Sequence, residues 1–532
     1  MQKNILIVFL FLFFHHRVIG QKLSDLSLEE KIGQLLIVQF CGEKVTQEAK
    51  QLIEEVKVGG FIYYNWSNGL SSPKQVATLS QELQQLAKIP LFIAVDQEGG
   101  IVCRLKEGFT DFPGNYALGK TKEPLFAYLA ALSMAKEMKA VGINLNFAPV
   151  IDVNSQPKNP VIHLRAFSSD TNEVIAFGEK ALKGFSERGI LTTIKHFPGH
   201  GDVTVDSHHD LPLLNKSLTE LKQLELKPFQ ALCKQSDLVM TAHLLVPALD
   251  PDWCTTLSKK SLDYLKEELG FTGVIISDSL VMKGVLKKCK SVEKAAAYAL
   301  NAGCDLLLLG GRELNAKNES SELKLEEIER VHTYLVNAVK KGEVAEARVN
   351  EAVTKVLALK KRIVPLLSAD NLTDSLNSVA HQLLAKEIAK KALKIVENSP
   401  EQLFPLAQKK ALILAPSFFS SLIKKAGFLK ISRKVETCFF NDFISDMQIL
   451  QVLDQASKAD YTILFLQSQL KNSVEISIAK KLIAQKSPFI LVATDETFDL
   501  LNLNADLIVQ TYSRSQFSFD VLKDYLEKRG NN

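Results

Sequence analysis

Cysteine is sparse in this chain, and its placement is irregular. Seven cysteines are spread over 532 residues, and no two of them form a C-x-x-C pair. A disulfide framework needs an even set of cysteines, and structural zinc sites usually bring cysteines in closely spaced pairs. The sequence therefore predicts neither kind of site. We expect the thiols to be free and buried, as isolated cysteines in globular proteins usually are.

The chain also lacks the glycine-rich signatures of nucleotide-dependent enzymes. No G-x-G-x-x-G or P-loop pattern follows any expected strand, which disfavours a cofactor-dependent enzyme. Four histidines fall close together in the sequence, at positions 196, 200, 208 and 209. They could be read as metal ligands, but we predict no metal and no cofactor. A reaction rate that a chelator leaves unaltered would agree with this expectation.

A strong excess of charge of one sign is missing as well. The chain has 64 Lys and Arg against 60 Asp and Glu, a formal net charge of +4, which argues against a nucleic-acid partner. Hydrophobic residues make up 46% and charged residues 23% of the chain. These are the proportions of ordinary globular domains, so a disordered protein is not expected.

The apolar run near the N-terminus, residues 5–14, is too short to cross a bilayer as a helix. Its length is typical of a signal-peptide core, and we predict a signal peptide over residues 1–20, cleaved after Gly20. The basic HHR sequence beside that point is atypical, so an uncleaved membrane anchor stays an alternative. A functional leader would place the protein in the periplasm, outside the cell or at its surface; otherwise it would be cytoplasmic.

Beyond the leader, short apolar runs alternate with amphipathic stretches of helical length, which predicts an α/β fold. Eight strand-like runs over about 280 residues match the number and spacing of strands in a (β/α)8 TIM barrel, which we place at residues 25–365. Several runs are apolar throughout, as strands covered on both faces should be. A doubly wound open sheet is the structural alternative. The expected strands are 36–40, 60–64, 91–95, 143–147, 191–195, 238–241, 274–277 and 305–309.

A second, smaller domain is predicted after the barrel. Residues 366–398 are interpreted as a linker followed by a helix over 380–398. From residue 399 to 532 the alternation resumes, which indicates an α/β sandwich domain. Its five strand-like runs are KKALILAP, KVETCFF, DYTILFLQ, PFILVATDE and ADLIVQTY.

The segment most informative about function is residues 195–212, KHFPGHGDVTVDSHHDLP. It holds one Lys, four His and three Asp in eighteen residues, and we expect such a stretch to lie outside the packed core. It follows the apolar run 190–194, at the end of a strand, which is where barrel enzymes carry their catalytic residues. Within it, Asp206 stands two residues before His208, and a carboxylate so close can orient an imidazole and raise its pKa. A purely structural hydrogen bond is the alternative reading.

Other charged side chains follow other expected strands. Asp278 ends the run GVIISD, where it would face the mouth of the barrel, although it could instead cap the next helix. Asp96 ends a third run, two glycines make a turn, and Arg104 follows eight residues later. An acceptor and a donor in this order suit a polyhydroxyl ligand, with a structural ion pair as the alternative. Arg165, after the fourth strand, adds a donor or is an exposed loop residue.

Taken together, these segments resemble glycoside hydrolase family 3, and within it the β-N-acetylglucosaminidases. The likeness covers residues 26–309 and continues more weakly into the second domain. Departures from the family pattern are Ile101 in place of a common Arg, HLRAF in place of a GDRSF-like run, and Ser279 in place of a second Asp. The segments that carry the resemblance are LSLEEKIGQLL, DQEGGIVCRLKEGFTDFP, NFAPVIDV, KHFPGHGD with DSH, and IISDSLVMKG.

The resemblance implies a role for each matching residue. Asp278 would be the nucleophile, His208 the general acid and base, and Asp206 the group that orients His208. The sugar hydroxyls would be held by a further set of side chains: Asp96, Arg104, Arg165, Lys195 and His196. Retention of anomeric configuration would follow from the covalent glycosyl-enzyme.

The implied activity is a retaining exo-β-N-acetylglucosaminidase acting on a small oligosaccharide or muropeptide, as in peptidoglycan turnover. Three alternatives stay open. A β-N-acetylglucosaminide phosphorylase is one, because a neutral His repels phosphate less than a carboxylate does. A β-glucosidase is the second, and a non-catalytic sugar-binding protein, which would not need both Asp278 and His208, is the third.

Overall fold

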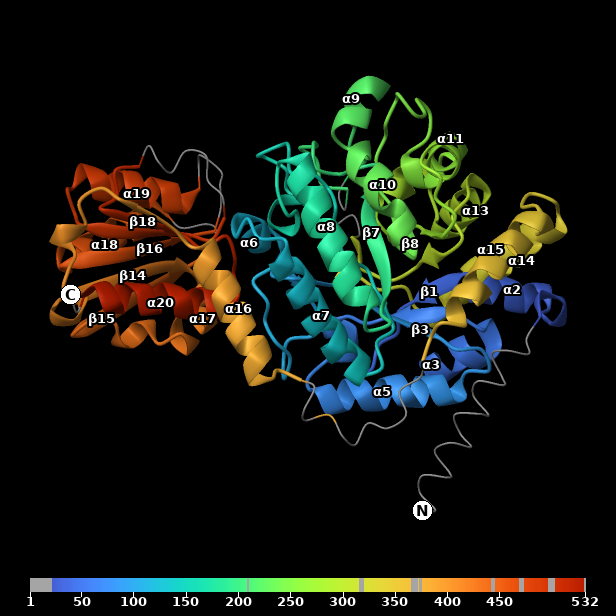
Figure 1. The fold of residues 1–532 in the computed structure, drawn as a ribbon, viewed down its shortest axis with the longest axis horizontal. Coiled ribbons are helices and arrows are strands. Elements are labelled where there is room, and N and C mark those ends of the chain that lie inside the picture. The colour runs from blue at the N-terminus through green and yellow to red at the C-terminus, as the bar shows by residue number, and fades with distance from the viewer. Residues whose placement is uncertain are drawn as a thin grey trace, which may run out of the picture. The chain divides into compact units, whose positions relative to one another are not determined.

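The computed structural model describes residues 22–207, 210–314, 320–364, 372, 376–441, 445–467, 473–495 and 503–530 (Figure 1). The expected signal peptide, residues 1–20, and most of the expected linker lie outside these ranges. The chain forms two compact units. The first comprises residues 1–98, 102–110 and 127–378, and the second comprises residues 99–101, 111–126 and 379–532.

The first unit is an eight-stranded parallel barrel, as predicted. Its strands pair in the order β10-β1-β2-β3-β6-β7-β8-β9. A parallel bridge between Ile276 and Leu306 joins the two ends of this sheet. The strands are buried on both faces, which explains their continuous apolar runs. They are β1 (Leu36–Val38), β2 (Gly60–Ile62), β3 (Phe92–Val95), β6 (Leu145–Asn146), β7 (Leu191–Phe197), β8 (Leu238–Thr241), β9 (Val274–Ile276) and β10 (Leu307–Leu308).

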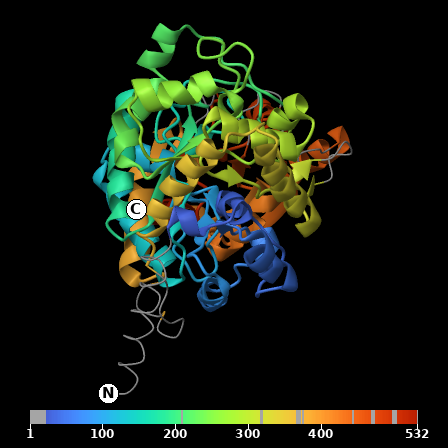
Figure 2. The same ribbon diagram turned by 90° about the vertical axis from the view of Figure 1, so that its right-hand side faces the viewer.

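Helices cover the outside of these strands. The helices Leu325–Lys340 and Glu346–Lys360 pack beside the helix Leu28–Gln34, as both views show (Figures 1 and 2). The ion pairs Lys340–Glu29 and Lys31–Glu346 join them. Ser27 is the N-cap of the helix Leu28–Gln34, and its hydroxyl accepts from the Glu30 N–H in a capping box. The helices are α2 (Leu28–Gln34), α3 (Gln47–Gln51), α4 (Asn65–Asn68), α5 (Pro73–Leu86), α7 (Leu125–Ala140), α8 (Thr171–Ser186), α9 (Leu218–Gln223), α10 (Leu226–Leu232), α11 (Lys259–Asp263), α12 (Lys283–Cys289), α13 (Val292–Ala302), α14 (Leu325–Lys340) and α15 (Glu346–Lys360).

One expectation about the segment 195–212 is wrong for its first residues. Strand β7 continues to Phe197, two residues beyond the expected end at Lys195, and Lys195 and His196 are buried together with His200. Charged groups can be buried when oppositely charged or hydrogen-bonding partners surround them. The sequence reading did not foresee those partners, most of which come from segments distant in the chain.

The second unit is a six-stranded sheet with helices on both sides (Figure 1). The strand order is β13-β18-β17-β16-β14-β15. All five predicted strands are present: β14 (Lys410–Pro416), β15 (Lys434–Phe440), β16 (Tyr461–Leu466), β17 (Phe489–Ala493) and β18 (Leu507–Gln510). The helices of this unit are α6 (Asn115–Lys120), α16 (Val379–Ala392), α17 (Ser420–Lys425), α18 (Asp446–Ser457), α19 (Val474–Ala484) and α20 (Gln516–Gly530).

The helix predicted over residues 380–398 is too long. Helix α16 ends at Ala392, and the strand β13 (Lys394–Glu397) follows it and pairs antiparallel with β18. The side chains of Ile395 and Val396 point to opposite faces of the sheet and pack into its two separate cores. This two-sided packing outweighs the helical pattern that the lysines and alanines of the preceding segment suggest.

The expectation of free, buried thiols can also be compared with the structure. All seven cysteines are free, and five are buried, but Cys41 is exposed and Cys438 is half-buried. Within the described ranges, we find no helix with both the length and the apolarity needed to cross a bilayer.

Candidate active site

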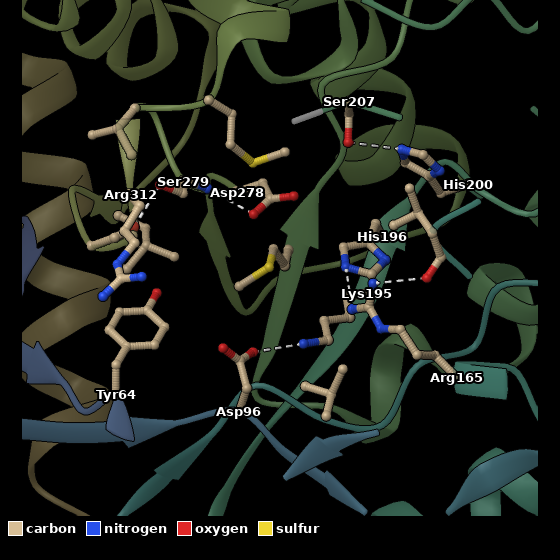
Figure 3. Close-up of a pocket in the computed structure, with 18 of the residues that line it drawn as sticks. Tyr64, Asp96, Arg165, Lys195, His196, His200, Ser207, Asp278, Ser279 and Arg312 are labelled. Carbon is tan, nitrogen blue, oxygen red and sulfur yellow. Dashed lines mark hydrogen bonds and ion pairs between the residues drawn. The ribbon is translucent and has the colours of Figure 1, made fainter. Parts of the chain in front are cut away.

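The barrel holds a cavity of about 440 Å³ at the carboxyl ends of its strands. In Figure 3, Asp278 lies across this cavity from Asp96 and Lys195, with Tyr64 and Arg312 along one side and Arg165 along the other. Six of the eight residues predicted to form the site line this one cavity: Asp96, Arg104, Arg165, Lys195, His196 and Asp278. They come from loops and strand ends that are up to 182 residues apart in sequence.

Asp96 and Lys195 line the cavity across from Asp278 (Figure 3). Asp96 directly follows β3, and its Oδ1 accepts from the Lys195 ammonium at 2.8 Å. The Arg104 guanidinium lies 3.6 Å from the other carboxylate oxygen. Burial alone would raise the pKa of Asp96, but the charges of Lys195 and Arg104 outweigh it and lower the pKa to about 2. The carboxylate is therefore ionised at neutral pH and is an acceptor for hydroxyl groups.

Glu98 is a buried anion that the sequence reading missed. Its Oε1 lies 2.7 Å from the Lys195 Nζ, and the Arg165 guanidinium donates to both carboxylate oxygens at 2.9 and 3.0 Å. Burial would raise the pKa of Glu98, but Arg165 and Lys195 lower it. Glu98 thus fixes two of the predicted sugar-binding cations. Its place in the DQEGG segment, two residues after Asp96, was the available signal.

His196 has hydrogen-bonding partners on both ring nitrogens. Its Nδ1 lies 2.7 Å from a carboxylate oxygen of Asp152, and its Nε2 lies 3.2 Å from the Arg165 Nη2. A guanidinium has no acceptor, so this second contact is a hydrogen bond only when the ring proton sits on Nδ1. Asp152 is fully buried and was also missed, although it belongs to the quoted segment NFAPVIDV.

Asp152 also anchors the loop that follows β7. Its Oδ1 accepts from the backbone N–H of His200 at 2.7 Å. A Cβ at Gly201 would lie 1.7 Å from the carbonyl oxygen of Val153, so only glycine allows the loop to pack this closely. Next, the His200 Nε2 lies 3.1 Å from the Ser207 hydroxyl. These contacts of His200 and Ser207 therefore hold the loop in place up to the residue before His208.

Burial and the neighbouring His196 lower the pKa of His200 to about 4. His200 is therefore neutral near pH 7. An unfolded chain binds this proton with a pKa of about 6.5, so between pH 6.5 and 4 the unfolded state holds more protons. The fold accordingly loses stability as the pH falls through this window, by roughly 3 kcal/mol from this group alone. Above pH 6.5 His200 does not contribute to the pH dependence of the free energy of unfolding.

We expect His200→Gln to remove this loss, because glutamine does not titrate. Chemical denaturation at pH 7, 6, 5 and 4 should give a free energy of unfolding that falls less steeply with falling pH in the variant. The difference in slope should correspond to about one proton fewer taken up on unfolding. Ser207→Ala is the matched control, since it removes the hydrogen-bond partner of His200 and leaves the buried imidazole. Equal slopes in His200→Gln and the wild type would contradict the assignment.

The predicted nucleophile Asp278 lies two residues after β9. Its Oδ1 accepts from the Ser279 N–H at 2.7 Å. The alternative reading as a helix cap is wrong, because the N-cap of α12 is Met282. Asp206 precedes Ser207 on the anchored loop and does not line the cavity. His208 lies outside the described residues, so its predicted role, and that of Asp206 in orienting it, stay predictions.

Aromatic and cationic side chains that the sequence reading missed line one side of the cavity. Tyr64 and Trp66 stack with ring centroids 4.3 Å apart, and Trp66 is 40% exposed. The Arg312 guanidinium lies over the Trp66 ring at 4.8 Å, and Arg104 lies over it at 5.2 Å. Burial and the nearby Asp96 raise the pKa of Tyr64, so its hydroxyl keeps its proton.

The fold and this cavity are those of a barrel enzyme with a ligand-sized site that charged side chains line. Among the described residues, no group of three or more His, Cys, Asp and Glu is placed to hold a metal ion. Residues 27–359 match the N-terminal domain of glycosyl hydrolase family 3. The chain is therefore a glycoside hydrolase, and it belongs to family 3.

Relatives of known name agree with this assignment. The chain is 31% identical to beta-hexosaminidase A of Pseudoalteromonas piscicida over 413 residues, which cover 70% of this chain and 68% of that one. It is 37% identical to a beta-hexosaminidase of Idiomarina loihiensis over 278 residues, covering 52% and 83%. The structure of a family 3 β-N-acetylglucosaminidase from Paenibacillus superposes with a TM-score of 0.82 at 31% identity, covering 95% and 97%.

Proposed function

We propose that this protein is a retaining exo-β-N-acetylglucosaminidase that removes terminal β-linked N-acetylglucosamine. The observation that carries the proposal is the shared cavity of Asp278 with the paired ions Asp96 and Lys195. The carboxyl group of Asp278 thus faces a set of hydroxyl-binding groups across a space that fits a sugar (Figure 3). The names of the relatives support the choice of N-acetylglucosamine.

The chemistry has two steps. In the first, a carboxylate oxygen of Asp278 bonds to the anomeric carbon, the glycosidic C–O bond breaks, and His208 gives its proton to the leaving oxygen. In the second, water attacks the same carbon, His208 takes a proton from that water, and the bond to Asp278 breaks. Asp206 orients His208 in both steps. Two inversions give net retention.

The remaining cavity residues bind the terminal sugar. Asp96 accepts hydrogen bonds from hydroxyl groups, while Arg104 and Lys195 donate them. Arg165 and His196 complete the subsite, and their contacts with Glu98 and Asp152 hold them in place before substrate arrives. Such preorganisation reduces the cost of ordering the site on binding.

We further propose that the substrate is a peptidoglycan fragment. At the cavity, the Arg312 guanidinium lies over the exposed Trp66 while its Nε pairs with Glu322 at 3.1 Å, and a planar cation so placed suits a polar aglycone that carries a carboxylate. A functional leader in residues 1–20 would bring the enzyme to this substrate outside the cytoplasm, in the periplasm, at the cell surface or in the medium.

Hydrolysis of p-nitrophenyl N-acetyl-β-glucosaminide, with and without inorganic phosphate, tests the proposal. We expect free N-acetylglucosamine in the β-configuration as the first product under both conditions. Glycosyl phosphate as the main product would make the enzyme a phosphorylase. A faster reaction with p-nitrophenyl β-glucoside would make it a β-glucosidase. If neither substrate is turned over, the protein would be a non-catalytic sugar-binding protein.

A further inference from the structure

A buried histidine from a neighbouring strand contacts the turn that carries Asp278. His243 lies two residues after the end of β8 and is fully buried. Its Nε2 lies 2.8 Å from the carbonyl oxygen of Ser279, and its Nδ1 lies 2.8 Å from the Thr256 hydroxyl. A carbonyl oxygen can only accept, so Nε2 carries a proton and donates it to Ser279.

Ser279 links this histidine to the carboxylate. Its backbone N–H donates to the Asp278 Oδ1 at 2.7 Å, and its hydroxyl donates to the Gly310 carbonyl at 2.5 Å. The carbonyl that His243 contacts, which also accepts from the Met282 N–H at 3.2 Å, belongs to the same residue as this N–H. The orientation of Ser279 therefore sets the direction from which the Asp278 carboxylate receives a hydrogen bond.

We infer that His243 is a positioning residue that fixes the orientation of the Asp278 carboxylate through Ser279. The inference rests on the proposed function of Asp278 as nucleophile. Attack on an anomeric carbon needs the carboxylate in a narrow range of positions, and a misplacement of about 1 Å can cost roughly 100-fold in rate. The second contact of the ring, to Thr256, prevents the imidazole from rotating away from Ser279.

Two substitutions at this position separate positioning from packing. The side-chain nitrogen of glutamine can occupy the place of Nε2, so His243→Gln keeps the donor to Ser279. The asparagine side chain reaches only the place of Nδ1, so His243→Asn keeps a polar partner for Thr256 and loses the donor. Both variants replace the ring by an amide in the same buried place.

The measurement is the single-turnover rate of glycosyl-enzyme formation with an aryl N-acetyl-β-glucosaminide, beside the dissociation constant for that substrate. We expect His243→Asn to be slower than the wild type by about tenfold or more, with the dissociation constant changed by no more than about twofold. We expect His243→Gln to keep a rate within about threefold of the wild type. Thermal unfolding of both variants reports the packing cost separately.

Equal rates in the two variants, whether both fast or both slow, would overturn the inference. If His243→Asn does not fold, Thr256→Val provides the second test, because it frees the other side of the ring and should slow glycosylation at an unchanged dissociation constant. A wild-type rate in that variant would also overturn the inference. Failure of the proposed function is distinguishable, because Asp278→Ala would then stay active.

Discussion

Asp278→Ala will abolish turnover of an aryl N-acetyl-β-glucosaminide, with kcat lower by roughly 10⁴-fold or more, as when other covalent nucleophiles are removed. The physical reason is that the carboxylate both forms the covalent bond and offsets the positive charge at the anomeric carbon. Substrate binding should be largely kept, because Asp96, Arg104 and Lys195 remain. Steady-state kinetics together with calorimetric binding of N-acetylglucosamine provide the measurement.

Azide sharpens the test of Asp278. In Asp278→Ala, azide can enter from the vacated side and should give the α-glycosyl azide. In His208→Ala, which we expect to be slower by about 10²- to 10⁴-fold, azide should attack the glycosyl-enzyme and give the β-glycosyl azide. A near-normal rate in Asp278→Ala, or the same azide anomer from both variants, would remove the assigned roles.

Glu98→Gln will lower both stability and activity, although no reacting group is touched. Glu98 lies between Lys195 and Arg165, and its carboxylate is almost completely inaccessible to solvent. Lys195 keeps Asp96 as a partner, but removing the Glu98 charge leaves part of the positive charge of this buried cluster uncompensated, at a cost of about 3–5 kcal/mol in the free energy of unfolding. Because both cations help to bind the sugar, kcat/KM should fall by about 100-fold or more.

Glu29→Gln is the matched control for that variant. Glu29 pairs with Lys340 at 3.0 Å, and both side chains are about half exposed. Its loss should change the free energy of unfolding by less than about 1 kcal/mol and leave the kinetics unchanged. Denaturant titration and steady-state kinetics measure both variants. Similar effects in the two would show that Glu98 has no special part in the site.

Much of the barrel could be predicted from the sequence because its signal is local. The eight apolar runs are each read within a few residues, and all eight are strands in the structure. Strand β13 could not be predicted in the same way. Its residues Ile395 and Val396 are placed by two cores that other strands and helices build, so a helical pattern in the neighbouring residues was misleading.

The candidate site shows the same division. Asp96, Lys195 and Asp278 could be named from their positions after apolar runs, and they do line one cavity. Glu98 and Asp152 were missed, because their importance lies in partners 97 and 44 residues away. The segments DQEGG and NFAPVIDV contain these two carboxylates, but a single sequence does not show which distant side chains they pair with.

By itself, the sequence determined which chemical groups follow which strands, since hydrophobic periodicity and turn residues act over short distances along the chain. Only the tertiary structure decided which of these groups meet and which are buried. Closure of the barrel brings Asp96, Glu98 and Lys195 within hydrogen-bonding distance. Their mutual attraction then offsets the cost of removing those charges from water, a balance that depends on three-dimensional neighbours and not on position in the chain.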